Sequence, residues 1–186
     1  MCILSALTYF LCTQSTPPPI HIITFTVSEH VDQDARIAPF LPQIDTLFIE
    51  SAKELFNTND TALVRDTIDK AHTYIFTPKK HISILFERCK VKGFLLYDEV
   101  THKTTIKPCF SINYFAIKKS DQRKGFGQKL LHYLANRKPY DLRLSVYKEN
   151  FAAREFYQKQ GFSIDSENQF EPASPLLHLI KKRVSC

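Results

Sequence analysis

The sequence predicts a single α/β domain in which a mixed central sheet is flanked by helices. The spacing of apolar residues changes near residue 78, from a helical period of about 3.6 to a strand period of about 2. Beyond that point strand-like and helix-like segments alternate, which is typical of layered α/β proteins. The composition is 44% hydrophobic, with 15 Phe and 8 Tyr in 186 residues, and this is enough apolar side chain for one core.

The first part of the chain predicts one strand and two helices. Residues 20–27 are β-branched and aromatic, which favours a strand. From Ile44 to Phe56 the apolar side chains recur at helical spacing. A second helix is expected to begin at an Asp60 cap and to end before Pro78. Its apolar positions are Val64, Ile68, Ala71 and Ile75.

The second part predicts a series of strands with two helices between them. Ile82–Val91 and Phe94–Tyr97 are interpreted as two strands joined through Gly93. Further strands are expected at about Cys109–Ile117, at Asp141–Tyr147, from Phe162, and near Leu176–Ile180. Helices are expected from Gly125 to about Asn136 and over Phe151–Gln160. The predicted order is therefore β, α, α, β, β, β, α, β, α, β, β.

Residues 1–19 are set apart from the domain that we expect over residues 20–186. Met1–Cys12 is apolar, but it lacks the basic start and the cleavage pattern of a signal peptide, and it is too short to span a bilayer. It can be an extra strand, an arm that faces a partner, or the product of a misassigned start codon. Thr16–Pro19 predicts a stiff linker. We expect a cytoplasmic protein without membrane association, and the oligomeric state stays open.

The net charge of +6 and the cysteines limit the function classes. The basic residues are spread along the chain without a nucleic-acid motif, so a solvated basic surface and attraction of a polyanionic cofactor are both open, and no nucleic-acid partner is expected. The cysteines show no metal-ligand spacing, so we expect reduced thiols and no metal site. They are Cys2, Cys12, Cys89, Cys109 and Cys186.

Two of the four glycines, Gly125 and Gly127, lie between a predicted strand and a predicted helix. Glycine permits a tight turn and lets a ligand approach the backbone N–H groups closely. The first amides of a helix lack partners, and the helix dipole favours an anion there. The junction therefore predicts a phosphate cradle. The third glycine of a dinucleotide fingerprint and the Gly-Lys-Ser/Thr of a P-loop are both missing.

The segment Gln122-Arg-Lys-Gly-Phe-Gly127 resembles the Gln/Arg-x-x-Gly-x-Gly/Ala signature of the GNAT superfamily of N-acetyltransferases. It follows an apolar-x-apolar strand end, Phe115-Ala-Ile117, at the family's usual distance. The resemblance implies that the turn binds the pyrophosphate of acetyl-CoA. It also implies that the backbone of Phe115 and Ile117 contacts the pantetheine and the acetyl carbonyl. The turn residues implied are Gln122, Arg123, Lys124, Gly125, Phe126, Gly127 and Gln128.

A second segment, residues 150–162, is similar to the family's Asn-x-x-Ala-x-x-hydrophobic-Tyr-x-x-x-Gly-Phe pattern. Asn150 is expected to cap a helix and to bond the amides of CoA, and Ala153 leaves room for the cofactor. The resemblance implies that Tyr157 lies near the CoA sulfur, where a phenol can protonate the departing thiolate. It covers about residues 82–180 and is tightest over 115–162.

The resemblance implies an enzyme that moves an acetyl group from acetyl-CoA to a primary amine of a small molecule or a protein by direct attack. The backbone N–H of Ile117 would polarise the carbonyl. Family members often carry a catalytic Glu at the positions that align with Ser111 and Ser145. Proton removal is therefore left to a water chain or to a carboxylate. The candidates are Glu87, Asp98 and Glu99. The same gap keeps open a non-catalytic CoA-binding regulatory module. A basic module for nucleic-acid or protein interaction is a further alternative.

Overall fold

The structure, a computed structural model, describes residues 20–26, 37–56, 61–88, 90–102, 106–168 and 174–183. The described strands form one sheet in the order β1-β2-β3-β4-β5-β7-β6, and helices flank them. The predicted mixed α/β class with a central sheet is therefore confirmed. The segment 1–19 and the expected cap Asp60 lie outside the described residues, so the predicted arm, linker and domain boundary stay predictions.

The chain divides into two compact units. Unit 1 comprises residues up to 96 together with 114–130, and unit 2 comprises residues 97–113 together with those from 131 onward. The boundary runs through β3 (Lys90–Thr101), β4 (Pro108–Ile117) and α5 (Phe126–Ala135), so each of these elements contributes to both units.

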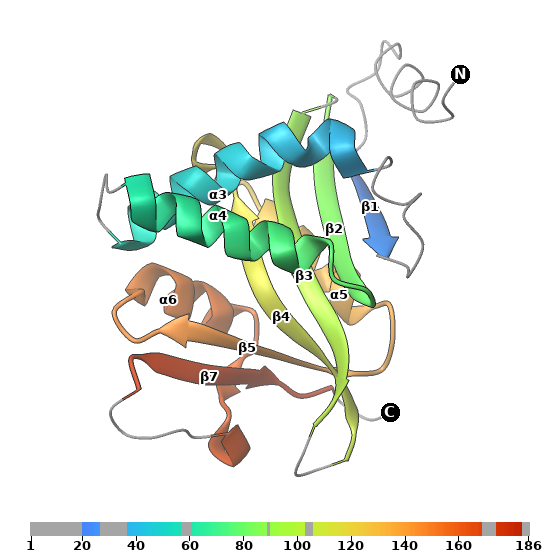
Figure 1. Cartoon of the computed structure of the whole chain (residues 1–186). Helices are drawn as coiled ribbons and strands as arrows, with labels where there is room; N and C mark the ends of the chain where they lie inside the picture. Colours follow the sequence, from blue (N-terminus) through green and yellow to red (C-terminus); the bar gives the residue numbers. More distant parts are fainter. Residues whose placement is uncertain are drawn as a thin grey trace. The chain divides into compact units, whose positions relative to one another are not determined.

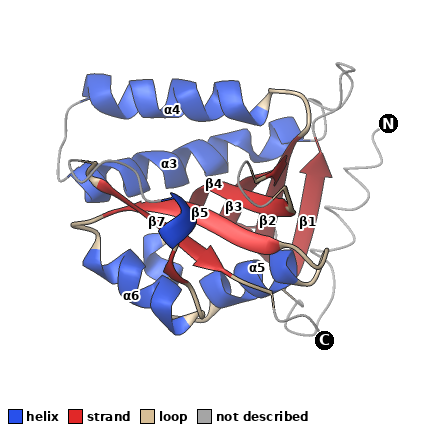
Figure 2. Ribbon diagram, turned by 90° about the horizontal axis from the view of Figure 1, so that it is seen from below, coloured by secondary structure: helices blue, strands red, loops and turns tan. Residues whose placement is uncertain are grey.

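Unit 1 contains β1 (His21–Thr26), β2 (Lys80–Glu87), the first part of β3 and the last part of β4. The β1–β2 pair is antiparallel. A short 3₁₀ turn, η2, precedes α3 (Leu41–Phe56), and α4 (Thr61–Ile75) follows. Figure 1 shows α3 and α4 side by side across one face of these strands, and Figure 2 shows α5 starting on the opposite face.

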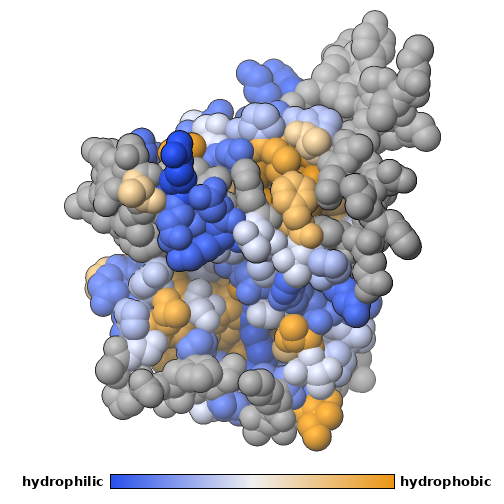
Figure 3. All heavy atoms as spheres, in the orientation of Figure 1, coloured by the Kyte–Doolittle hydropathy of each residue, from blue (hydrophilic) through white to orange (hydrophobic). Residues whose placement is uncertain are grey.

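Aromatic stacking joins α3 to the strands of unit 1. The Phe48 ring lies 4.6 Å from the Phe94 ring and meets the Tyr114 ring edge-on at 5.3 Å between centroids. Ile44, Leu47 and Ala52 are buried together with Phe48, so the predicted apolar stripe of this helix is confirmed over residues 44–52. Figure 3 shows a hydrophilic patch over part of α4. The exposed charged residues of α4 are Arg65, Asp66, Asp69 and Lys70.

The turn between β2 and β3 lies earlier than predicted. β2 ends at Glu87 and β3 begins at Lys90, so the prediction of two strands joined through Gly93 is wrong. Arg88 has a left-handed φ of 50° at this turn. Gly93 lies inside β3, where a Cβ would be 2.4 Å from Ile117 Cδ1 and 2.7 Å from the Ala116 carbonyl oxygen. Position 93 is therefore glycine because the end of β4 packs closely against it.

Unit 2 contains the end of β3, the start of β4, β5 (Asp141–Tyr147), α6 (Phe151–Lys159), β6 (Ser163–Ile164) and β7 (Leu176–Lys181), with the 3₁₀ turn η4 (Ser166–Asn168) after β6. β4 pairs with β5 in parallel from Cys109↔Asp141 to Ile112↔Leu144. β7 pairs antiparallel with both β5 and β6.

Alternation along β5 gives unit 2 an apolar and a polar face. Leu142, Leu144 and Val146 are buried. Arg143 is also buried, but it lies on the other face, where its guanidinium donates to Asp165 and, at 3.0 Å, to His102 Nε2. Among the described helices of the whole chain, none combines the length and the apolar character needed to cross a membrane.

Candidate functional site

The turn before α5 is built from two residues in left-handed conformation. It follows the 3₁₀ turn η3 (Lys119–Asp121), and Arg123 and Gly125 have φ of 60° and 82°. Left-handed residues placed so closely turn neighbouring backbone N–H groups toward a common point, which is an anion-binding arrangement. A Cβ placed on Gly125 would have nothing within 4 Å, so this side of the turn is open. Gln122–Gly125 are exposed, and the ten-residue helix α5 begins directly after them.

A buried carboxylate anchors this turn. Asp121 is 5% exposed and accepts hydrogen bonds from Lys124 Nζ at 2.9 Å and Lys92 Nζ at 3.1 Å. Burial alone would raise the pKa of Asp121, but the two lysine hydrogen bonds outweigh it and hold the pKa below its ordinary value. Asp121 did not emerge from the sequence. Its one signal there is an acidic residue inside a run of basic ones.

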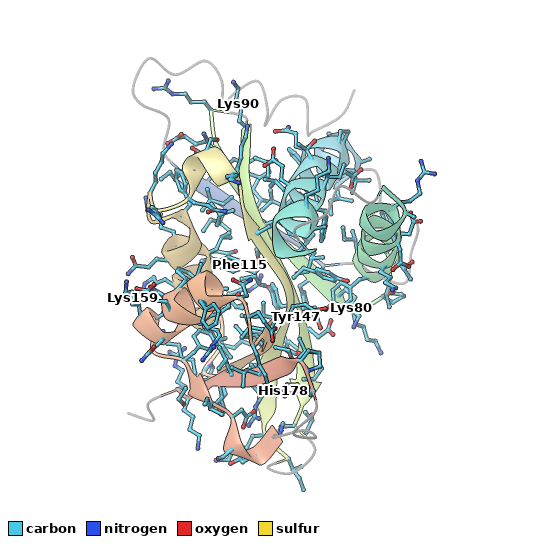
Figure 4. All side chains as sticks on the ribbon, turned by 90° about the vertical axis from the view of Figure 1, so that its left-hand side faces the viewer. Lys80, Lys90, Phe115, Tyr147, Lys159 and His178 are labelled. Carbon is cyan, nitrogen blue, oxygen red and sulfur yellow. The ribbon has the colours of Figure 1, made fainter. Side chains whose placement is uncertain are left out.

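The other predicted residues of unit 1 lie around this turn in different environments. Gln122 Nε2 donates to the carbonyl oxygen of Ile117 at 3.4 Å, which links the turn to the end of β4. The Phe126 side chain and Gly127 are buried, so the Phe126 ring packs in the core and only its backbone can face a ligand. Gln128 is exposed on the first turn of α5. Phe115, labelled in Figure 4, is half-buried on β4.

The predicted residues of unit 2 lie on α6. Asn150 Oδ1 accepts from the backbone N–H of Ala153 at 3.1 Å, so the predicted helix cap is confirmed. Tyr157 is buried against Phe162, with 5.5 Å between ring centroids, and burial raises the pKa of its phenol well above the ordinary value. The phenol is therefore protonated throughout the neutral range. Gly161, with φ of 84°, ends the helix as predicted.

Two of the three candidate carboxylate bases are held by lysines. Glu87 lies 3.4 Å from Lys92 Nζ, and Glu99 lies 2.6 Å from Lys138 Nζ. The third, Asp98, accepts a weak hydrogen bond from Asn113 Nδ2 at 3.4 Å. Within the described residues, no group of three or more His, Cys, Asp or Glu side chains is placed to hold a metal ion.

The serine at one of the aligned Glu positions has a histidine partner. Ser145 Oγ lies 2.9 Å from Nδ1 of His178, which stands on the neighbouring strand β7. Sequence reasoning did not find His178, because the two residues are 33 positions apart and only the strand register brings them together.

Comparison with known families identifies the fold. A family model described as "Acetyltransferase (GNAT) domain" matches residues 78–164. This part of the chain therefore forms a GNAT acetyltransferase domain, and the resemblance seen in the two motifs is confirmed. The match includes the turn before α5 and the whole of α6. The sequence matched none of the curated proteins.

Solved structures agree on the fold. The PaiA N-acetyltransferase of Thermoplasma acidophilum, solved in complex with coenzyme A, is 16% identical with a TM-score of 0.64, covering 88% of this chain and 99% of its own. An acetyltransferase of Thermus thermophilus is 18% identical with a TM-score of 0.62, covering 87% and 95%. A possible acetyltransferase of Clostridium difficile is 19% identical with a TM-score of 0.62, covering 83% and 97%.

Proposed function

We propose that this protein is an acetyl-CoA-dependent N-acetyltransferase that moves an acetyl group directly to a primary amine of a small molecule or a protein. The turn before α5 is the observation that carries the proposal. Its left-handed residues, its open side at Gly125 and the helix that follows together suit the doubly charged pyrophosphate of CoA. The GNAT domain at residues 78–164 and the coenzyme A complex of the Thermoplasma protein support the choice of cofactor.

The proposed reaction uses three groups of the chain. The amine nitrogen bonds to the acetyl carbonyl carbon, and the bond from that carbon to sulfur breaks. The backbone N–H of Ile117 donates to the carbonyl oxygen as negative charge develops there. Tyr157, whose hydroxyl is protonated at neutral pH, gives its proton to the sulfur of CoA as the bond from carbon to sulfur breaks, and the phenolate takes a proton back from solvent as CoA leaves. Most of the rate enhancement would come from holding amine and thioester in reacting geometry.

The proposed cofactor contacts follow the two motifs. The turn residues 122–128 bind the pyrophosphate, and the end of β4 at Phe115 and Ile117 binds the pantetheine through its backbone. On α6, Asn150 and Ala153 contact the cofactor beside Tyr157. We propose a cytoplasmic setting, which suits the buried thiol of Cys109.

Thermal unfolding with and without acetyl-CoA tests the proposal. A ligand that binds only the folded state stabilises it by about 2.7 kcal/mol at a hundredfold excess over its dissociation constant, so the midpoint should rise and saturate. Release of free CoA is then measured with a panel of diamines, aminoglycosides and lysine-containing peptides. No shift at millimolar acetyl-CoA would contradict the cofactor assignment. Binding without turnover of any amine would favour the regulatory module, which the serines at positions 111 and 145 motivate.

A further inference from the structure

Resting on the proposed acetyl transfer, we propose that Ser145 and His178 form the proton acceptor for the attacking amine. The amine must lose a proton, and neither aligned position carries a carboxylate. Ser145 occupies one of these positions, and the structure gives it an imidazole partner.

The pair is fixed by strand register. Ser145 and His178 are directly opposed in the antiparallel β5–β7 ladder, and opposed residues project from the same face of a sheet. Ser145 Oγ and His178 Nδ1 are 2.9 Å apart, within hydrogen-bonding distance. Ser145 is exposed and His178 is half-buried, so the hydroxyl faces solution with the imidazole beside it. Figure 4 labels His178, on β7, and Tyr147, on the neighbouring strand β5.

The second aligned serine shares this face. Ser111 is the register partner of Arg143, which lies two residues before Ser145 on β5 and therefore on the same side. Asn113, two residues beyond Ser111, hydrogen-bonds Asp98. Unit 2 thus presents a polar row over four strands, and His178 contributes an imidazole to this row beside Ser145.

The proton transfer is balanced within the pair. As the amine loses its proton to Ser145 Oγ, the hydroxyl of Ser145 gives its own proton to Nδ1 of His178. The serine ends as a hydroxyl, the imidazole becomes an imidazolium, and the proton later leaves to solvent. The nitrogen keeps the electron pair with which it attacks the thioester.

The charged groups around His178 are largely paired with one another. Its backbone carbonyl accepts from the N–H of Asp165 at 2.9 Å, so Asp165 flanks it on the β6 side. The Asp165 carboxylate is bound by Arg143, which also holds Glu167 at 3.2 Å. On β5 the phenol of Tyr147 lies two residues beyond Ser145. The hydroxyl of Ser145 therefore lies against an imidazole, while the adjacent carboxylates are engaged by a guanidinium.

The test compares Ser145→Ala, His178→Gln and the double variant with His132→Gln as control, because His132 is an exposed histidine that hydrogen-bonds Asn136 on α5. Acetyl-CoA affinity is measured by calorimetry, and kcat is measured with the best amine of the panel. We expect unchanged affinity and a kcat loss of about 10²-fold at about pH 7 in each single variant. The double variant should be no slower than the singles, because the two groups act in series. The loss of kcat relative to wild type should become smaller as the pH approaches the pKa of the amine, because more of the amine is then already neutral and needs no base.

Each other outcome overturns the inference. Wild-type rates in Ser145→Ala and His178→Gln would exclude the pair while leaving the proposed function intact. A loss of kcat that does not change with pH would mean that Ser145 and His178 only stabilise the sheet. An acetyl group found on Ser145 by mass spectrometry would mean that the reaction passes through a covalent acetyl-serine. Ser145 is exposed, so Ser145→Ala gives a folded test even if His178→Gln does not fold. If the wild-type protein binds acetyl-CoA but acetylates no amine, the assignment of Ser145 and His178 as the proton acceptor is wrong. Absence of acetyl-CoA binding would contradict the proposed function itself.

Discussion

The turn before α5 in unit 1 and the start of α6 in unit 2 look alike in sequence but differ in structure. Both are polar segments between a strand and a helix, and both match family motifs. At α6 the side chain of Asn150 accepts the N–H of Ala153, so the helix start is closed by its own cap. At α5 the residue before the helix is Gly125, which has no side chain to cap with, and the backbone around it is left-handed and open. A helix start that lacks a side-chain cap is the better anion site.

Gly125→Leu tests the open turn and should have the largest effect. The new side chain would fill the space proposed for the pyrophosphate, so acetyl-CoA binding should fall at least about 10²-fold, or about 2.7 kcal/mol. Gly161→Leu is the matched control, because Gly161 has nearly the same φ, 84° against 82°, and ends α6 rather than beginning a helix. Calorimetry on both variants separates backbone strain from ligand exclusion. If both variants lose the same affinity for acetyl-CoA, the turn before α5 is not a specific site for the pyrophosphate.

Tyr157→Phe tests whether a side chain of α6 takes part in acetyl transfer. If the phenol protonates the thiolate, kcat should fall by about 10²-fold while the affinity for acetyl-CoA stays the same. Stopped-flow measurement of thiol release gives the rate. Burial raises the pKa of Tyr157, so the wild-type rate should show no loss from its ionisation below about pH 10. An unchanged kcat would leave Tyr157 as a core residue that packs on Phe162.

Asp121→Asn tests the anchor beneath the turn. Loss of the charged hydrogen bonds from Lys92 and Lys124 should lower the free energy of unfolding by roughly 1.5–3 kcal/mol. Because the pKa of Asp121 is held below its unfolded value, this stabilisation is present above about pH 4 and is lost as the pH falls through the folded pKa. Denaturation curves at several pH values should therefore show a gap between wild type and variant that is constant near neutrality and narrows in acid. A gap independent of pH would contradict the ion pairing.

Asn150→Ser should have the smallest effect, and it separates the helix-cap role of Asn150 from its proposed contact with CoA. Serine is about as good a cap as asparagine, so stability should change by only a few tenths of a kcal/mol. The variant loses the amide donor that we propose for CoA, so the affinity for acetyl-CoA should fall a few-fold. Asn150→Ala, which loses the cap as well, should cost about 1 kcal/mol of stability. If Asn150→Ser binds acetyl-CoA like wild type, Asn150 is only a cap.

The sequence predicted the elements well wherever one local signal was sufficient. The stripe that includes Ile44 and Phe48 located α3, and the glycines at 125 and 161 marked the start of one helix and the end of another. The prediction of a turn at Gly93 was wrong, because a glycine between apolar runs resembles a turn, whereas this one accommodates Ile117 of the neighbouring strand β4. The actual turn at Arg88 has no glycine to mark it.

The two motifs of the candidate site could be recognised in the sequence, whereas the contact partners of its residues could not. Gln122–Gly127 and Asn150 could be located because their spacing is local. The Asp121–Lys92 contact and the Ser145–His178 contact join residues 29 and 33 positions apart. The Ser145–His178 contact depends on strand register, because a shift of one residue in a strand moves every side chain to the other face. The Asp121–Lys92 contact depends on where the turn η3 lies beside β3. A single sequence contains no direct measure of that register.

Gly93 also determines how substitutions at position 93 should affect this protein. A methyl group at position 93 would first meet Ile117 and Ala116, the strand end whose backbone we propose to face the thioester. A change at position 93, inside β3, would therefore act on turnover by displacing a neighbour. Inventories of ligand-contacting residues would omit position 93, yet it sets how near two strands can come. Inherited or engineered substitutions there should be judged by catalytic rate rather than by thermal stability alone.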